Sequence, residues 1–441
     1  MDRRSFIKNL GNIVGGTMIG GYLLDNSLIS AATLGTTFLA NVYVAKNGTP
    51  AENVAKVIDM RFGGIEHFIG PDDVVVINPN GQWPNQGGSN CACCMGLIDL
   101  ILNRPGGFNG EIILTECTQF QPDGYWTATG SGLDRNGPYN FNDMITYYHN
   151  NGHENVSGVR IWRNEDDPTN WPIITGPDEG QGWVRPQWIS PVSSCEFYLS
   201  YPIIESPYSG KLIDLRNGVY DGTYEGQPPL KFIKMPNLNN HGTGAQQDYA
   251  GVTSAVKSFL GISELEGACG GGSYFKDGHH NMHTFDYGEC GDRAFAMGES
   301  VGAWMKNCRK PDLFLTTAEW VGWGSRTSDN ATQTKTVGLC NDPVSLDYYM
   351  CKYVLWPTHI EQQYFNPEYD IPNNNTRQTL NGCHSQGFGT VTESEIAAFI
   401  YDFNSPTTFR FDIDRMITRF REGEASEQEV LELIREYNEG Q

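Results

Sequence analysis

Apolar residues along the chain form short β-branched runs, separated by stretches with the spacing of a helix. The runs at 41–46, 73–77 and 111–114 predict strands, and the four consecutive β-branched residues in the second are typical of a strand buried on both faces. Residues 50–60 carry apolar side chains at helical spacing, and 95–102 form a short apolar helix. This alternation predicts an α/β fold: a mainly parallel sheet with helices on both faces.

A long α/β domain is predicted over 41–404, with one elaboration inside it. Residues 118–229 are rich in Trp, Tyr, Gly and Pro, which is typical of a long loop-and-strand insertion. After this elaboration the apolar pattern resumes, and it predicts strands at 231–235 and 312–316 and helices near 249–260 and 294–306.

The C-terminal segment differs in composition from the rest of the chain. Residues 409–441 contain no Cys, Trp, Pro, His or Lys, and apolar side chains recur at helical spacing in two stripes around Gly423. This pattern predicts a C-terminal helical hairpin. The hairpin either folds back on its own domain or forms a separate module that docks to a protein partner.

The N-terminus has the three-part layout of an export signal. Arg3 and Arg4 are followed by an uncharged, Gly-rich stretch at 10–24 and by small residues at 30–32. The paired arginines resemble the twin-arginine type, so residues 1–32 predict a signal peptide read by the twin-arginine export machinery. The apolar stretch is too short for a permanent membrane span. We therefore expect the mature protein in the periplasm, outside the cell or at the cell surface.

The charge and the cysteines narrow the classes of protein. Fifty-two acidic residues against 30 basic ones leave a net charge of −22, which argues against nucleic acid as a partner. All eleven cysteines follow the predicted signal peptide, so an exported chain could pair ten of them and leave one over, or keep buried thiols. The dense group of Cys91, Cys93 and Cys94 is the alternative candidate for binding a transition metal or an iron–sulfur cluster.

Polar side chains suited to acid–base chemistry follow several of the predicted strands. Asn80, Glu116 and His241 each come after an apolar run, and Lys257 lies on the predicted helix after His241. Because open α/β sheets bind ligands at the carboxyl ends of their strands, we expect these side chains in one crevice. A His, a Lys and carboxylates there suit acid–base catalysis or a metal. The predicted catalytic residues are Asn80, Glu116, His241, Lys257, Asp342 and Asp347.

These residues also have structural interpretations. His241 could be a surface or capping residue, Lys257 a solvated helix position and Asp342 the start of a turn at Pro343. A second group, in a Gly-rich loop, offers imidazoles with carboxylates nearby, and it either binds a transition metal or is simply solvent-exposed. Its predicted metal ligands are His279, His280 and His283.

Several short segments occur in the order of a known family. They include a strand ending in Asn78-Pro79-Asn80, a strand ending in Glu116 and a strand end that carries His241; the full set is 74–80, 112–116, 232–241, 251–261, 342–347 and 387–389. In this order they resemble domain-of-unknown-function family 362 over roughly 42–389. The resemblance implies an α/β fold with a crevice of catalytic type, but it names no substrate.

Two positions depart from the pattern of family 362. The family's lysine before Pro79 is Asn78 in this chain, and its lysine near His241 is Asn239. If those lysines bind an anionic group in relatives, Lys234 or Lys257 are the nearby substitutes. The resulting hypothesis is an exported enzyme that carries a metal or another cofactor and acts on an unknown small molecule. The alternatives are a non-catalytic binding or surface-assembly protein that docks through 409–441, and a disulfide-linked structural protein.

Overall fold

The fold is described from a computed structural model. This structure describes residues 39–117, 124–133, 135–161, 171–241, 251–265, 275, 277–283, 290–322, 330–358 and 366–405. The predicted signal peptide at 1–32 and the predicted hairpin at 409–441 lie outside the described residues, so both stay predictions.

A large sheet forms the centre of the domain. Its strands lie in the order β16-β1-β15-β14-β11-β2-β3-β4, and every neighbouring pair is parallel except those made by β15. This arrangement confirms the predicted α/β fold with a mainly parallel sheet. The strands are β1 (Ala40–Lys46), β2 (Val74–Pro79), β3 (Glu111–Glu116), β4 (Val156–Arg160), β11 (Leu230–Met235), β14 (Leu313–Gly322), β15 (Ala331–Cys340) and β16 (Ile396–Asp402).

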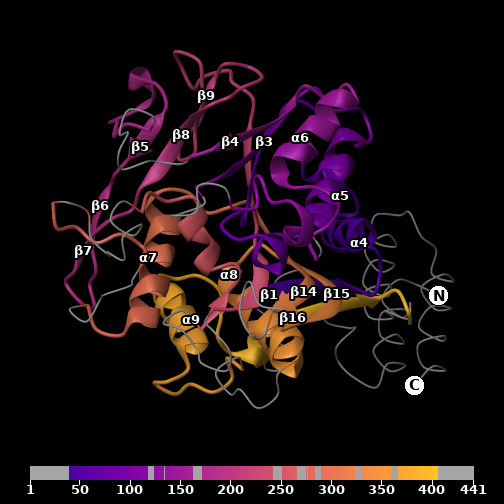
Figure 1. Cartoon of the computed structure of the whole chain (residues 1–441). Coiled ribbons are helices and arrows are strands. Elements are labelled where there is room, and N and C mark those ends of the chain that lie inside the picture. Colours follow the sequence, from indigo (N-terminus) through magenta and orange to yellow (C-terminus); the bar gives the residue numbers. More distant parts are fainter. Residues whose placement is uncertain are drawn as a thin grey trace, which may run out of the picture.

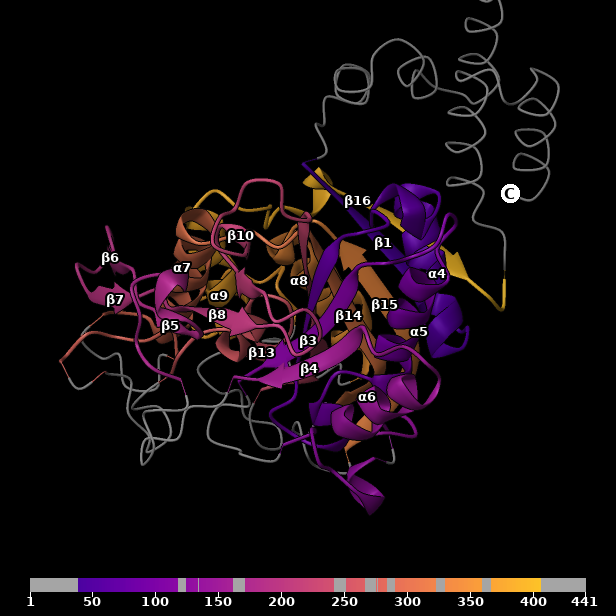
Figure 2. The same cartoon turned by 90° about the horizontal axis from the view of Figure 1, so that it is seen from above.

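Helices cover both faces of this sheet because successive strand residues point to opposite sides. In β2, Val75 and Ile77 pack with α4 (Pro50–Phe62), α5 (Cys91–Leu102) and α6 (Phe141–Asn150). Val74 and Val76 belong to the other core, with α7 (Arg293–Asn307), α8 (Pro343–Met350) and α9 (Asn375–Ser385). Figures 1 and 2 show α4, α5 and α6 gathered apart from α7, α8 and α9.

The helix starts follow from capping side chains. Thr49 and Glu52 form a capping box at the start of α4, which confirms the predicted helix there. Asn90 accepts a hydrogen bond from the Cys93 N–H, so α5 begins at Cys91, four residues before the predicted start.

The elaboration is smaller than predicted. Within 118–229, α6 and β4 belong to the main α/β unit, because β4 pairs with β3 and α6 covers the first face of the sheet. The remainder forms a four-stranded sheet in the order β10-β9-β8-β5 and a two-stranded ribbon. The strands are β5 (Gly182–Val184), β8 (Tyr201–Glu205), β9 (Leu212–Asp214), β10 (Gly218–Tyr220) and, in the ribbon, β6 (Gln187–Ile189) and β7 (Glu196–Tyr198). These strands pack against α7, where the Trp304 Nε1–H donates to Ser200 O at 2.8 Å.

The predicted helix at 249–260 is wrong. Residues 251–260 instead contain the short strand β13 (Val252–Thr253), which pairs with β12 (Asn237–Asn240), followed by the 3₁₀ turn η5 (Lys257–Gly261). The left-handed backbone of Gly251, with φ of 69°, turns the chain into β13 and prevents a continuous helix from forming there.

Close packing of α7 against α9 completes the second face. A Cβ on Gly298 of α7 would lie 1.9 Å from Thr379 O, and one on Gly382 of α9 would lie 2.0 Å from Phe295 O. Glycine at these two positions therefore lets the backbones of α7 and α9 approach each other, as no larger residue could.

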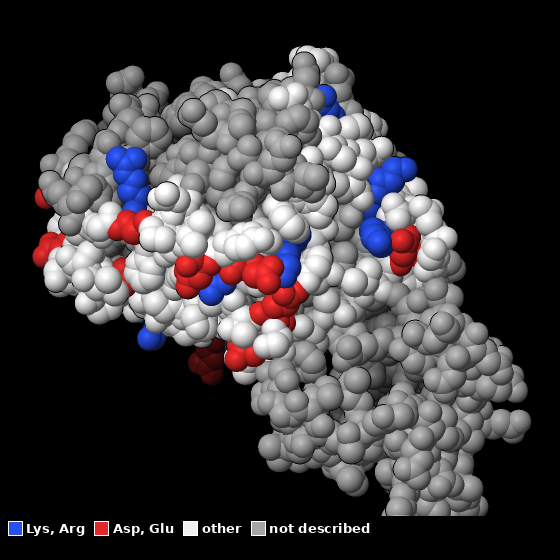
Figure 3. All heavy atoms as spheres, turned by 90° about the horizontal axis from the view of Figure 1, so that it is seen from below, with Lys and Arg blue, Asp and Glu red and all other residues white. Residues whose placement is uncertain are grey.

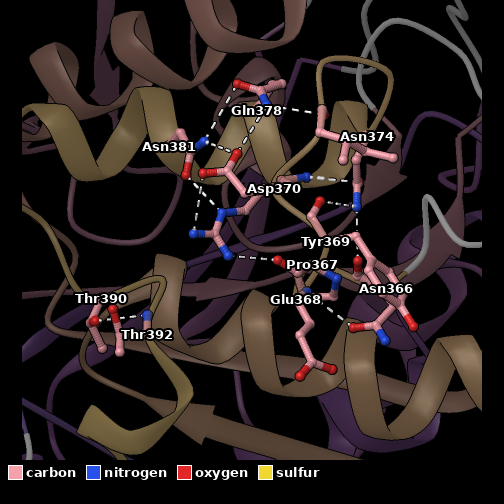
Figure 4. A network of polar contacts seen from close by, with 12 residues as sticks. Asn366, Pro367, Glu368, Tyr369, Asp370, Asn374, Gln378, Asn381, Thr390 and Thr392 are labelled. Carbon is pink, nitrogen blue, oxygen red and sulfur yellow. Dashed lines mark hydrogen bonds and ion pairs between the residues drawn. The ribbon is translucent and has the colours of Figure 1, made fainter.

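Hydrogen bonds hold the segment before α9, as Figure 4 shows. Arg377 donates to Pro367 O at 2.7 Å, and Asn374 caps the helix.

The described surface carries both acidic and basic side chains. On the face seen in Figure 3, acidic and basic side chains are both present among the described residues, and most of the basic ones have an acidic side chain nearby. Within the described ranges, no helix combines the length and the apolar character needed to cross a membrane.

Candidate functional site

Four of the six predicted catalytic residues line one pocket at the carboxyl edge of the sheet, which we call the edge pocket. Asn80 follows β2, Glu116 ends β3, His241 follows β12 and Lys257 opens η5. They meet because β2, β3 and β11 run parallel, so that their carboxyl ends lie at one edge. The complete lining is Asn80, Gln82, Glu116, His241, Thr253, Lys257, Ser258, Leu260 and Gly261.

The strand ends around the edge pocket are tied together by hydrogen bonds. The Asn80 N–H donates to Ser89 Oγ at 2.7 Å, and the Ser89 hydroxyl donates in turn to Met235 O at the end of β11. The His241 N–H donates to Gly251 O at 3.0 Å, which fixes His241 at the end of the β12–β13 hairpin. The lining is thus fixed through the backbone.

A buried lysine forms part of the floor. Lys234 on β11 is 0% exposed, and its ammonium donates to Asn78 Oδ1 and, at 2.8 Å, to Ser258 O. Burial lowers the pKa of Lys234 well below its ordinary value, while the nearby Glu116 carboxylate acts in the opposite direction. The sequence indicates this burial, because Lys234 lies two positions after Phe232 in β11 and so points to the same face of the sheet as that fully buried residue.

Glu116 is nearly inaccessible and sits between two glycines. A Cβ on Gly261 would lie 2.9 Å from Glu116 Oε1, and one on Gly81 would lie 3.2 Å from Glu116 Oε2. Both glycines therefore provide the room that the carboxylate occupies. No local pattern predicts these contacts, because they join segments far apart in the chain.

Thr253 adds a buried hydroxyl group to the edge pocket. Its hydroxyl is buried in the edge pocket and has no hydrogen-bond partner among the described residues. Buried polar groups in proteins are rarely left in this condition. The cavity itself is small, about 20 Å³, which suits one water, one ion or one polar group of a larger molecule.

Asp342 and Asp347 do not line the edge pocket. Asp347 is buried and accepts hydrogen bonds from the Ala255 and Val256 N–H groups at 2.9 and 2.8 Å, so it holds the turn that carries Lys257. Burial raises the pKa of Asp347 to about 6. Asp342 caps α8 by accepting from the Ser345 N–H at 2.9 Å. Both aspartates therefore support the scaffold rather than face the pocket.

The two departures from family 362 have structural roles. Asn78 lies opposite Lys234 in the strand register, and its amide donates to Thr115 O at 2.5 Å. Asn239 donates to Gln86 O at 2.6 Å and accepts from the Gly322 N–H at 2.7 Å. The Lys234 ammonium therefore lies against Asn78, which occupies one of the two positions where family 362 has a lysine.

The predicted histidine ligands do not form one site. His279 lies against Asp277, with Nδ1 3.1 Å from Asp277 Oδ1, and stacks on Tyr198 at 4.1 Å between ring centroids. Among the described residues, His280 instead lies together with Cys195 and Cys290, close enough for the three to share a metal. His279 and His283 are not in that group.

The predicted metal ligands Cys91, Cys93 and Cys94 line the core instead. They lie on α5, and the Cys91 thiol contacts Met144 Sδ at 3.7 Å. Burial raises the pKa of Cys91 to about 12 and that of Cys93 and Cys94 well above the ordinary value. Among the described residues, they do not belong to a group of three ligand-type side chains close enough to share a metal.

Cysteine pairing is limited to one bond in the described part of the chain. Cys195 and Cys290 form a disulfide, and eight other cysteines are thiols, most of them buried. Cys269 lies outside the described residues. Ten paired cysteines are therefore not present, whereas the alternative of buried thiols is confirmed for most of them.

Comparison with known proteins adds no assignment: no protein-family model matches the chain, and no curated protein matches it. The resemblance to family 362 accordingly stays a prediction from the motif order.

Proposed function

We propose that this chain is an enzyme that binds a small anionic molecule in the edge pocket and transfers protons to and from it. The observation that carries the proposal is the convergence of Asn80, Glu116, His241 and Lys257, from four separate segments, on one pocket. Titratable groups that meet in a concave, largely water-excluded place are the usual components of acid–base catalysis.

Each lining residue has a proposed task. Lys257 attracts the anionic group, and the Thr253 hydroxyl hydrogen-bonds to it. His241 and Glu116 exchange the protons, because imidazole and carboxylate are the side chains best suited to that chemistry near neutral pH. Lys234 is a positioning residue, since it is fully buried and holds the pocket floor through Asn78 and Ser258.

Acid–base chemistry is favoured over a resident metal at the edge pocket. Among the described residues, three potential ligands gather elsewhere, at Cys195, His280 and Cys290. The edge pocket combines one imidazole and one carboxylate with a lysine, which as an ammonium group repels a cation.

The test uses inorganic phosphate and pyruvate as anionic probes. Calorimetric titrations of the full chain in two buffers of different ionisation enthalpy give both the affinity and the protons taken up on binding. We expect at least one probe to bind with proton uptake. The substitution Lys257→Met should abolish binding, whereas His241→Asn should retain weakened binding without the uptake.

Lys231→Met is the matched control, because Lys231 lies on the same strand as Lys234 and packs over Phe68, away from the pocket. It should bind like the wild type. Failure of both probes to bind, undiminished binding by Lys257→Met, or unchanged proton uptake by His241→Asn would contradict the proposal.

We further propose that the chain is exported through its twin-arginine signal and is related to family 362. The paired arginines and the small residues at 30–32 support export, and the placement of Asn80, Glu116 and His241 in one pocket supports the relationship. Replacing Arg3 and Arg4 together by Lys in a reporter fusion should block its export. A docking role for 409–441 stays a prediction.

A further inference from the structure

Three donor groups favoured by soft metal ions meet at the end of the β6–β7 ribbon, away from the residues of the edge pocket. Their ligand atoms, the two sulfurs of Cys195 and Cys290 and a ring nitrogen of His280, all lie within 4.8 Å of one another. His280 Nε2 is 3.4 Å from Cys290 Sγ. His280 and Cys290 are buried, whereas Cys195 is half-buried and gives access from solvent. We call these three residues the Cys–His group.

The imidazole is held beside Cys195 by the backbone. The His280 N–H donates to Glu196 O at 2.8 Å, and the Tyr198 N–H donates to His280 O at 3.0 Å, so His280 pairs with the ribbon immediately after Cys195. The His280 ring also packs against Phe197 at 5.5 Å between centroids. None of these contacts depends on the sulfur–sulfur bond.

Cys195 is held by the chain around it as well, and Cys290 lies close to the start of a helix. Cys195 O accepts from the Ser190 N–H at 2.9 Å, which closes the turn of the ribbon. Cys290 comes two residues before Asp292, the residue that caps α7. Breaking the disulfide would therefore leave two sulfurs and one ring nitrogen facing a common point.

We propose that reduction of the Cys195–Cys290 disulfide converts the Cys–His group into a zinc site. Two thiolates and one neutral imidazole form a Cys₂His ligand set, and zinc in such a set keeps its fourth position for water or another ligand. Two thiolates also balance the charge of Zn²⁺, which matters because the site is mostly buried. The oxidised pair has no thiolate to offer, so the metal and the disulfide exclude each other.

The conversion of the disulfide into the zinc site is chemically balanced when an ordinary thiol is the reductant. Two thiol molecules transfer two electrons to the sulfur–sulfur bond and become one small disulfide, while Cys195 and Cys290 become thiols. Zinc then displaces the two thiol protons into solvent as both zinc–sulfur bonds form, so its affinity falls as the pH falls. A small-molecule disulfide reverses the reaction and releases the ion. In both states the ribbon stays linked to the start of α7.

The test measures zinc bound to the folded full-length chain before and after reduction by a phosphine, which does not itself compete as a thiol. We expect about one zinc per chain after reduction and none in the oxidised protein. His280→Gln should lose the zinc of the reduced protein while it keeps the disulfide and the native circular dichroism of the oxidised protein. Cys195→Ser should lose the zinc as well.

His279→Gln and Cys308→Ser are the controls, because His279 is the neighbouring imidazole and Cys308 a half-buried thiol outside the group. Both should bind zinc like the wild type. A reduced, folded wild type without zinc, or a His280→Gln variant that retains it, would overturn the proposal. Neither outcome bears on anion binding in the edge pocket, which rests on other residues.

Discussion

The edge pocket and the Cys–His group are both buried polar centres, but they are built in opposite ways. The edge pocket gathers oxygen and nitrogen groups from the ends of the central sheet, above a fully buried lysine. The Cys–His group gathers sulfur and imidazole from a ribbon of the elaboration and from the chain before α7. The first centre belongs to the scaffold, whereas the second lies where an added segment is fastened to it.

This difference shows how each centre should respond to change. Residues of the edge pocket are positioned by strand pairing and by hydrogen bonds of their backbone atoms, so a side-chain substitution there can change binding while the backbone contacts stay. In the Cys–His group, by contrast, the sulfur–sulfur bond can be opened and closed chemically while the backbone contacts of His280 remain. We therefore expect the two centres to fail independently, and the predictions below test that expectation.

The largest effect is expected from removing the disulfide. Replacing Cys195 and Cys290 together by Ala should lower the free energy of unfolding by about 4 to 5 kcal/mol, because the bond links residues 95 positions apart and restricts the unfolded chain. Denaturant titration in metal-free buffer measures the loss. Anion binding in the edge pocket should not change; a parallel loss of binding would show that the two centres are coupled.

Replacing Lys234 in the floor of the edge pocket should lower the free energy of unfolding by nearly as much. Lys234→Met leaves the buried acceptors Asn78 Oδ1 and Ser258 O without this donor, at a total cost of about 4 kcal/mol. The control Lys231→Met should have little effect.

The pH dependence of stability tests the buried state of Lys234. Because burial lowers the pKa of Lys234, the unfolded chain binds this proton more readily than the folded one. The wild type should therefore gain stability relative to Lys234→Met as the pH rises toward 10.5. A constant difference across that range would contradict this account.

Asp347 offers a pH test of the support beneath Lys257. Burial raises its pKa from 3.8 to about 6, so between these values the folded protein holds a proton that the unfolded chain releases. The stabilisation from this proton is present at low pH and is lost as the pH rises through about 6, by an amount on the order of 3 kcal/mol. Unfolding titrations across this range should show the slope in the wild type but not in Asp347→Asn. The exposed control Asp72→Asn should keep it.

The central sheet and most of the edge pocket could be predicted from local pattern. The β-branched run of β2 is sufficient to identify a doubly buried strand, and polar residues directly after parallel strands must meet at one edge. For that reason the sequence predicts that Asn80, Glu116 and His241 lie together, whatever the order of the strands in the sheet.

The features that could not be predicted from the sequence depend on contacts between segments far apart in the chain. Asp347 accepts from backbone groups at 255 and 256, a contact that no local pattern specifies. The odd number of cysteines likewise gave no reason to pair Cys195 with Cys290, because their approach depends on how the ribbon packs beside α7. The helix predicted at 249–260 failed for the same reason, since pairing of β13 with β12 outweighed its helical spacing.

The smallest effect should come from adding one methyl group to the edge pocket. In Gly261→Ala the new Cβ would lie 2.9 Å from Glu116 Oε1 and 3.1 Å from Glu116 Cγ, so the carboxylate has to move. We expect a loss of about 1 to 2 kcal/mol in unfolding free energy, together with weaker binding of phosphate or pyruvate. The control Gly176→Ala adds its methyl group to open space and should change neither. If Gly261→Ala lost stability but bound the probes as tightly as the wild type, Glu116 would belong with Asp347 among the supporting residues, and proton transfer in the edge pocket would rest on His241 alone.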